Sequence, residues 1–394
     1  MRQLYTLMSS LIINKVEWRR WLPVVVAVAV ACVLLLGFPY VMVTREQSLL
    51  FLWNGDYFVE RIVLPGGLAQ YLGELLTQFF GNPIVAAIIY GVLCLLAQRL
   101  MLRLVPRYYW LSYVPVAVIF LLAFDTYIPL TLTVSLLLTM GIMAMLPGEG
   151  RWRLFCTAIL IPIGYWLLGP AIVLMPLCCI RWSPLLAVLL AACVIGSSWV
   201  APYPLRQIAR GIDYYWEEEH SNTMEEMECD MLVRQKKWNS LVSKFSNSAS
   251  PAIQNARALA MFQTGRIGEG ELKERLNLSG SVLRTQSSAF IMSEVYLLMG
   301  MVQLSQRCAF EAMESVPNHN KSGRALRRLV ETNLVCGHTA VALKYIAVLE
   351  ETYAYHGFAA RHRPLAEHPE LMDRHPYFNP LREVYEKSRD TFFH

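Results

Sequence analysis

Long apolar stretches fill the first two hundred residues of this chain, whereas the second half mixes apolar and charged positions with the spacing of helices. The apolar stretches that we consider as membrane-spanning segments are residues 21–43, 83–97, 108–124, 127–146, 154–168, 171–180 and 184–200. No strand-like alternation competes with the helical spacing in the second half. The pattern therefore predicts an all-α protein, in which a polytopic transmembrane helical bundle precedes a soluble α-helical domain. The predicted boundaries are 1–203 for the membrane domain of about seven spans, 204–227 for a linker and 228–394 for the soluble domain.

The composition supports this division. Hydrophobic residues make up 55% of the chain and charged residues only 16%, which is unusual for a globular protein. The net charge of +5 is modest, and it comes mainly from arginines that flank the apolar stretches. Such arginines indicate membrane topology rather than nucleic-acid binding, so the bilayer is the expected partner and nucleic acid is not.

The basic residues predict the side of the membrane on which each loop lies. If residues 154–168 and 171–180 cross separately, the cytoplasmic side receives Arg2, Lys15, Arg19, Arg20, Arg99, Arg103, Arg107, Arg151, Arg153 and Arg181. The N-terminus of this predicted bacterial inner-membrane protein is then cytoplasmic, and the soluble domain is periplasmic. If residues 154–180 instead form one kinked helix, the soluble domain is cytoplasmic, an alternative that Arg206 and Arg210 favour.

An amphipathic helix is predicted near residues 66–80, in the loop between the first two spans. Its apolar face consists of Leu68, Tyr71, Leu72, Leu75, Leu76, Phe79 and Phe80. Gln70, Glu74 and Gln78 occupy the other side. Such a helix lies in the membrane interface with its apolar face down, or it packs against neighbouring spans.

Acidic residues beside the apolar stretches are the candidates for chemistry. Asp56 and Glu60 stand one helical turn apart after the first span, and Asp125 lies in the turn between the third and fourth spans. A carboxylate at the edge of an apolar bundle is costly, and it could bind a metal or act as a base. The alternatives are a solvated loop acid or an Asp that caps the next helix.

The soluble half shows paired helices. Helical spacing covers residues 231–245, 252–262, 289–299, 304–313, 322–335 and 339–352. Gly265, Gly300 and Gly337 each end a first helix, at spacings of about 35 and 37 residues. Pairs with this layout resemble tetratricopeptide-type repeats, which commonly hold a peptide or partner helix. An ordinary helical bundle is the alternative.

Motifs of common enzymes and cofactor sites are missing from the sequence. It contains no Cys-x-x-Cys pair, no phosphate-binding loop, no nucleophile elbow and no His-Glu-x-x-His helix. Histidines gather at His356, His362, His368 and His375, in a segment that we interpret as a solvated loop before a final helix at residues 380–388. No cofactor or metal is expected from these residues, and the sequence leaves open whether the protein is an enzyme.

Two resemblances bear on function. The acids Asp56 and Asp125, with an interfacial helix after the first, resemble the membrane module of C-type glycosyltransferases, which use lipid-linked sugars. That resemblance implies that Asp56 binds a divalent metal or activates the acceptor and that Asp125 assists. The sequence has no Asp-x-Asp signature in these loops, which is a departure from the family pattern.

The second resemblance covers most of the chain. Residues 51–58, 65–72, 76–80, 203–204, 211–214, 309–313 and 321–324 are similar to a family of Bacteroidota integral membrane proteins whose activity is not established. This resemblance implies a membrane location but no mechanism.

Two function classes follow. In the first, the helical-repeat domain is a non-enzymatic scaffold for envelope partners, and the membrane half anchors it. In the second, the protein transfers a sugar from a lipid-linked donor with Asp56, Glu60 and Asp125 as acid or metal residues. We favour the scaffold, because the catalytic signature is incomplete and the repeat pattern is positive evidence.

Overall fold

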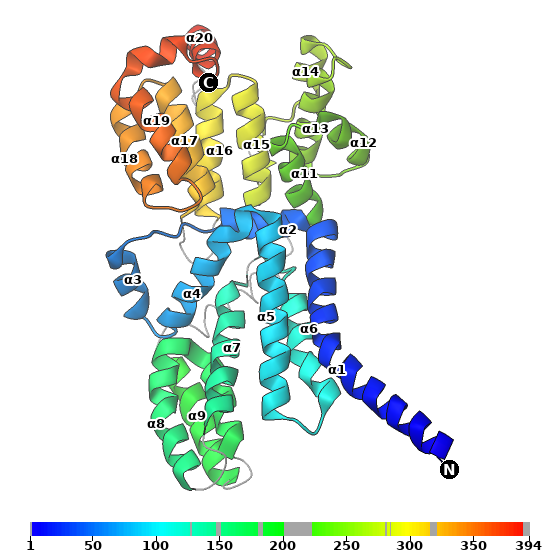
Figure 1. Ribbon diagram of the computed structural model, residues 1–394. Coiled ribbons are helices and arrows are strands. Elements are labelled where there is room, and N and C mark those ends of the chain that lie inside the picture. Colours follow the sequence, from blue (N-terminus) through cyan, green and yellow to red (C-terminus); the bar gives the residue numbers. More distant parts are fainter. Residues whose placement is uncertain are drawn as a thin grey trace. The chain divides into compact units, whose positions relative to one another are not determined.

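The computed structural model describes residues 2–126, 128–146, 151–179, 184–200, 223–279, 282–283, 285–315 and 321–388. Within these ranges the secondary structure is helical and contains no β-strand, as the sequence predicted (Figure 1). The chain forms two compact units. The N-terminal unit consists of Met1–Met42 and Val59–Arg206, and the C-terminal unit consists of Val43–Phe58 and Gln207–His394. The predicted linker at 204–227 lies almost wholly outside the described residues.

The elements of the first half follow the predicted apolar stretches. They are α1 (Arg2–Gly37), α2 (Pro39–Gln47), α3 (Gly55–Ile62), α4 (Gly67–Thr77), η1 (Gln78–Gly81), α5 (Pro83–Leu104), η2 (Tyr109–Tyr113), α6 (Val114–Leu122), α7 (Leu130–Met145), α8 (Arg151–Leu168), η3 (Gly169–Cys179) and α9 (Pro184–Val200). Among the described residues, two helices are long and apolar enough to cross a membrane, Trp18–Gly37 and Pro83–Leu104. Shorter apolar helices are Tyr109–Leu122, Leu130–Met145, Phe155–Leu168 and Pro184–Gly196.

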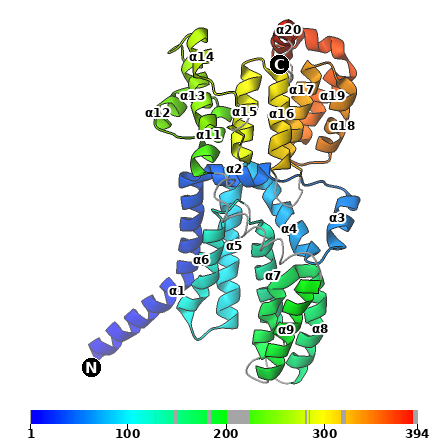
Figure 2. The same cartoon turned by 180° about the vertical axis from the view of Figure 1, so that it is seen from behind.

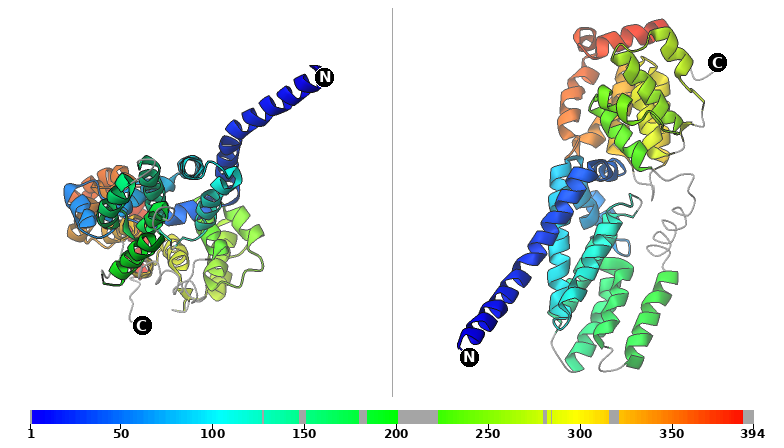
Figure 3. Two further views of the ribbon diagram at one scale, coloured as in Figure 1. Left: turned by 90° about the horizontal axis from the view of Figure 1, so that it is seen from below. Right: turned by 90° about the vertical axis from the view of Figure 1, so that its right-hand side faces the viewer.

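Helices α1 and α5 pack closely against each other. A Cβ atom added to Gly91 would lie 3.2 Å from the carbonyl oxygen of Ala27 and 3.5 Å from Cβ of Ala31. Small residues at such a crossing let two helix backbones approach, which is common where helices associate in lipid. Helix α1 contains Pro23 and is bent, as the views in Figure 1 and Figure 3 show. Proline is the usual cause of such a bend, because it removes one helical hydrogen bond.

Helix α4 and the residue after it bury part of the polar side that the sequence predicted. Glu74 and Gln78 are buried, whereas Tyr71 and Leu75 remain partly exposed. The helix packs against α7 and α8, as the packing interpretation required. Glu74 is satisfied there, because Arg61 donates to it at 2.9 Å and Gln70 donates at 2.9 Å. The interior side of the helix therefore carries an ion pair and an amide, whereas most of the predicted apolar face is only partly buried.

Residues 154–180 do not form a single helix. Helix α8 ends at Leu168, and Gly169 has a φ of +77°, a conformation that ends an α-helix. The 3₁₀ segment η3 then packs back on α8, where Ile172 lies directly against Gly164. The alternative of one kinked helix is therefore wrong, and the two apolar stretches are separate elements.

The C-terminal unit is built from short helices, drawn in green to red in Figure 2. They are α11 (Met224–Arg234), α12 (Trp238–Lys244), α13 (Pro251–Gln263), α14 (Glu269–Arg275), α15 (Gln286–Leu298), α16 (Val302–Glu314), α17 (Gly323–Val335), α18 (Thr339–Glu350), α19 (His356–Glu367), η6 (Pro369–Arg374) and α20 (Phe378–Ser388). Helix α19 occupies the segment predicted as a loop. Its His362 ring stacks on Phe358 with centroids 3.8 Å apart, so packing of rings stabilises this helix. The prolines and histidines of the segment had favoured a loop.

The three glycines singled out in the sequence each end a helix. Gly265, Gly300 and Gly337 have φ values of +70°, +80° and +78°, which only glycine adopts readily. Each turn has the same two backbone hydrogen bonds. For example, Gly300 N donates to Leu297 O, and Met301 N donates to Tyr296 O.

A fourth turn has the same bonds without glycine. Lys236 has a φ of +53°, and its N–H donates to Val233 O while Lys237 N donates to Leu232 O. This turn splits the predicted helix 231–245 into α11 and α12. The sequence did not indicate this turn, because lysine rarely adopts a left-handed conformation.

Candidate functional site

The segment Val43–Phe58 is the feature that sequence analysis did not foresee, and we call it the inserted segment. It follows α1 in the chain but belongs to the C-terminal unit. Residues 49–53 are not helical and bond through their backbone: Gly323 N donates to Leu49 O at 3.3 Å, and Trp53 N donates to Glu351 O at 2.8 Å. Ser48 Oγ also donates to Gln286 Oε1 at 2.7 Å. The helices of this unit thus bind a non-helical segment of their own chain.

Apolar side chains of the inserted segment complete the core of the C-terminal unit. Leu50 is buried in a cluster that includes Leu326, Leu329 and Phe358. Phe51 is buried as well, and its ring contacts Tyr57 with centroids 5.2 Å apart. Burying a leucine or phenylalanine side chain contributes about 1.5–3 kcal/mol. The inserted segment is therefore part of this unit's core rather than a loop lying on its surface.

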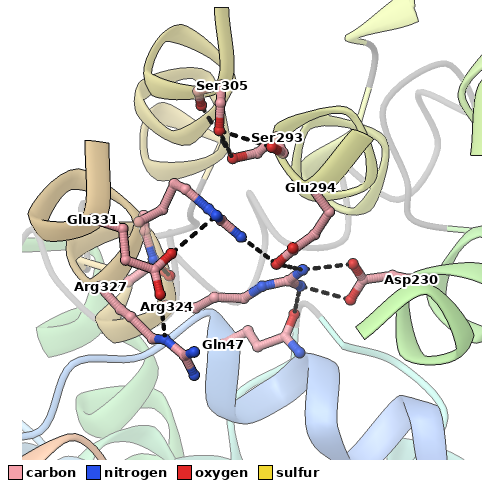
Figure 4. Close-up of polar contacts among 11 residues, drawn as sticks. Gln47, Asp230, Ser293, Glu294, Ser305, Arg324, Arg327 and Glu331 are labelled. Atoms are coloured by element: carbon pink, nitrogen blue, oxygen red, sulfur yellow. Dashed lines mark hydrogen bonds and ion pairs between the residues drawn. The ribbon is translucent and has the colours of Figure 1, made fainter. Parts of the chain in front are cut away.

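A buried ionic network adjoins the inserted segment (Figure 4). The guanidinium of Arg324 donates to both carboxylate oxygens of Asp230, at 2.6 and 2.7 Å, and to Gln47 Oε1 at 2.8 Å. Its other side faces the Phe290 ring, 4.2 Å from Cζ to the centroid. A bidentate pair of this kind fixes orientation as well as charge, so Arg324 positions Gln47 of the inserted segment relative to α11 and α17.

The network continues from Arg324 along α17. Glu294 lies 3.7 Å from Arg324 and 2.5 Å from Arg328. Arg328 lies 2.9 Å from Glu331, which in turn contacts Arg327 at 3.2 Å. Acids and arginines thus alternate, so each buried charge has an opposite neighbour, as burial of charge requires.

Neighbouring opposite charges shift the pKa values of Glu294 and Arg328 so that the ionised forms are favoured. Burial alone would raise the pKa of Glu294, but the guanidinium groups of Arg328 and Arg324 outweigh burial and lower that pKa to about 2. Burial disfavours the charged form of Arg328, yet Glu294 and Glu331 raise its pKa. Glu294 therefore stays ionised across physiological pH, and it is not a proton donor or acceptor near neutrality.

Glu46 of the inserted segment behaves differently. It is buried, and its Oε2 accepts a hydrogen bond from Tyr355 OH at 3.2 Å. Burial raises the pKa of Glu46 to about 7, although Tyr355, Arg234 and Arg324 act in the opposite direction. Burial and Glu46 also raise the pKa of Tyr355 well above its usual value. The Glu46 carboxyl group therefore titrates near neutral pH.

The acids predicted from the sequence lie elsewhere. Asp56 is exposed in the first turn of α3, whose N-terminus is capped by Asn54 rather than by Asp56: Tyr57 N donates to Asn54 Oδ1 at 2.7 Å. Glu60 is exposed and lies 3.4 Å from Arg61. Asp125 accepts from Ile128 N at 3.3 Å, within the turn before α7. Asp56 belongs to the C-terminal unit and Asp125 to the N-terminal unit, so neither unit by itself brings these two acids together.

Among the residues that the structure describes, no group of three His, Cys, Asp or Glu side chains is placed to hold a metal ion. Sequence reasoning also did not nominate Arg324, Arg328 or Glu331. Their spacing of four and three residues places them on one face of α17. That charged face was the available signal, but the partners of Arg324 stand 94 and 277 residues away in the chain.

Comparison with known proteins gives a family but no activity. No curated protein and no solved structure matches the chain. The model of a family of unknown function, DUF6057, matches residues 15–394. This match spans nearly the whole chain, both units included, and the protein therefore belongs to the DUF6057 family.

Proposed function

We propose that this protein is a multi-pass inner-membrane protein of a bacterium of the Bacteroidota, and that its C-terminal unit is a non-enzymatic helical-repeat scaffold for envelope partners. The N-terminus is cytoplasmic in this proposal, and the C-terminal unit is periplasmic, as the arginine distribution predicts.

The surface of the N-terminal unit supports the membrane part of the proposal. On α5, Ile84, Ile88, Val92 and Leu96 are exposed to between 45% and 58% and follow one another at intervals of four residues. They form an apolar stripe on the outside of the helix. Such a stripe is unfavourable in water, whereas in hydrocarbon it is the expected exterior of a helix. The buried Glu74 of α4 and Gln78 of η1 complete the same arrangement.

The inserted segment is the observation that carries the scaffold. Helical repeats stack into concave surfaces that bind segments of other chains. The C-terminal unit binds Leu49 and Trp53 through backbone bonds and buries Leu50 and Phe51. Its paired helices and left-handed turns fit the same architecture. We infer that this unit is built to hold peptide segments and that its remaining exposed surface holds a segment of another envelope protein.

In-cell photocross-linking tests the scaffold. A photoreactive residue replaces Phe310 of α16 or Val341 of α18, which are exposed to 38% and 40%. We expect a discrete adduct with one envelope protein, and no such adduct when the residue replaces Leu189 on the apolar surface of α9. Adducts of the same pattern from all three positions would contradict a specific scaffold.

The glycosyltransferase alternative makes a different prediction. The double variant Asp56→Asn with Asp125→Asn retains the adduct and the envelope glycans if the protein is a scaffold. Loss of a glycan or lipid-linked product at unchanged protein level would overturn the scaffold and favour catalysis. A reporter fused after His394 tests the sidedness, with a periplasmic signal expected and a cytoplasmic signal contradicting the topology.

A further inference from the structure

Five arginines gather where α1 and α5 meet η2, and their positive charge is not balanced by nearby acids. Arg19, Arg20, Arg99, Arg103 and Arg107 are all exposed. None of them forms an ion pair with a described side chain. The sequence from Pro83 to Phe124 contains no acidic residue, and Glu17, whose side chain lies outside the described part, is the one acid before Glu46.

Two of these arginines are held in place by the bend in α1. Pro23 has no N–H to bond the carbonyl of Arg19, four residues earlier. Tyr109 OH donates to that carbonyl at 3.0 Å, and Arg99 Nη2 donates to the neighbouring carbonyl of Arg20 at 3.3 Å. The bend therefore links α1 to η2 and α5, and it brings the backbone of Arg19 and Arg20 next to the Arg99 side chain.

Aromatic rings border the same arginines. The Arg19 guanidinium lies 5.2 Å from the centroid of Tyr109 and 6.0 Å from that of Trp18. Trp18 also contacts Trp110 with centroids 6.1 Å apart, and Trp110 is 66% exposed. Exposed tryptophans beside arginines are typical of the headgroup level of a bilayer, where an apolar ring and a polar edge are both accommodated.

The exposed stripe of α5 shows which ligand fits. It runs through Ile84, Ile88, Val92 and Leu96, all apolar, and then continues into Arg99 and Arg103. On α1, exposed Val28 and Val25 similarly lead toward Arg20 and Arg19. A ligand that lies along these stripes contacts apolar side chains over most of its length and guanidinium groups at one end. An anionic phospholipid has apolar acyl chains and a charged headgroup in this arrangement, whereas a free phosphate matches only the arginines.

We propose that Arg19, Arg20 and Arg99 bind the phosphodiester headgroup of an anionic phospholipid, whose acyl chains lie along α1 and α5. This inference rests on the membrane location proposed above. The guanidinium groups donate to the phosphate oxygens, and Trp18 and Trp110 flank the headgroup. The lipid supplies the negative charge that the N-terminal unit lacks at this end of α1 and α5.

Titration of the full-length protein in detergent tests the site. Phosphatidylglycerol, phosphatidylcholine and inorganic phosphate are added separately, and tryptophan fluorescence and the melting temperature are recorded. We expect phosphatidylglycerol alone to bind and to raise the melting temperature. Each lost arginine near an anionic headgroup weakens binding by about five-fold, so Arg19→Gln with Arg20→Gln weakens it about twenty-five-fold.

The control variant is Lys321→Gln with Lys344→Gln, which removes the same charge from exposed positions of the C-terminal unit and leaves the affinity unchanged. Equal responses to the two lipids, an equal response to phosphate, or an unaltered affinity of the arginine variant would overturn the lipid site. If the wild-type protein stays in the aqueous phase without detergent, the proposed membrane location fails as well. If it stays with the membrane but does not discriminate between lipids, only the headgroup site fails.

Discussion

The two units place polar and apolar side chains in opposite ways. In the N-terminal unit, Ile88 and Val92 are 58% and 57% exposed, whereas Glu74 is buried. In the C-terminal unit, Leu329 and Val330 are fully buried, and Arg324 enters the interior as a member of a paired network. The difference teaches that hydrophobicity alone does not reveal which side of a helix is inside. The membrane location that we propose accounts for this contrast, because hydrocarbon favours an apolar exterior and water favours a polar one.

The largest expected effect comes from breaking the buried network of the C-terminal unit. Asp230→Ala leaves Arg324 buried without its bidentate partner, and we expect a loss of about 3–5 kcal/mol in the free energy of unfolding. Denaturant-dependent labelling of the Cys229 thiol, which is buried in this unit, reports that loss. Lys244→Ala removes an exposed partner of Glu228 and costs at most about 1 kcal/mol. Equal effects of the two variants would show that the network is not a buried electrostatic core.

The second prediction concerns pH. The pKa of Glu46 is raised to about 7, so its contribution to stability is fully present below its unfolded value of 4.5 and is lost as pH rises through 7. Glu46→Gln should match the wild type near pH 4 and exceed it by about 3 kcal/mol above pH 8. Unfolding of the C-terminal unit across this pH range checks the difference. A constant gap between the two proteins would contradict a protonated Glu46 in the folded state.

The third prediction sharpens the comparison within the N-terminal unit. A Cβ on Gly73 would stand 2.6 Å from the backbone N of Thr131, where neither backbone can yield easily. Gly73→Ala should therefore destabilise the packing of α4 on α7 by about 1–3 kcal/mol. Gly141→Ala, at a helical position with open space around it, should stabilise by about 0.5–1 kcal/mol. The temperature at which the buried Cys94 thiol becomes exposed measures the change in stability of each variant, and we expect the two changes to have opposite signs.

The smallest effect tests the turns of the C-terminal unit. Lys236→Gly relieves a left-handed lysine and should stabilise by about 1 kcal/mol, whereas Gly337→Ala introduces the same strain and should destabilise by about 1–2 kcal/mol. Neither change alters a packed contact, because the position of Gly337 is open and Lys236 is exposed. Chemical unfolding of the two variants would contradict the shared turn geometry if both moved in the same direction.

Much of the secondary structure could be predicted from the sequence, because apolar periodicity and glycines at helix ends are local signals. Gly265, Gly300 and Gly337 ended helices as expected. The turn at Lys236 could not be read, since its left-handed residue carries a side chain that normally avoids this conformation.

The candidate site depended on long-range contacts that no local pattern encodes. Gln47 accepts a hydrogen bond from Arg324, which stands 277 residues later in the chain. This contact exists because residues 43–58 belong to the C-terminal unit, although the residues on either side of them belong to the N-terminal unit. Sequence analysis assigned those residues to the membrane half and sought function in their exposed Asp56. The buried Glu46 and Gln47 were overlooked because they stand directly after a long apolar stretch.

The contrast between the two exteriors can be measured directly with spin labels. A nitroxide is attached at Val92→Cys on α5 or at Val341→Cys on α18, both exposed positions, in a background without other cysteines and in lipid bilayers. We predict that the label at Val92 collides with oxygen dissolved in the lipid and is protected from an aqueous nickel chelate, whereas the label at Val341 shows the reverse. Access of the nickel chelate to both labels would contradict the membrane-embedded exterior of the N-terminal unit.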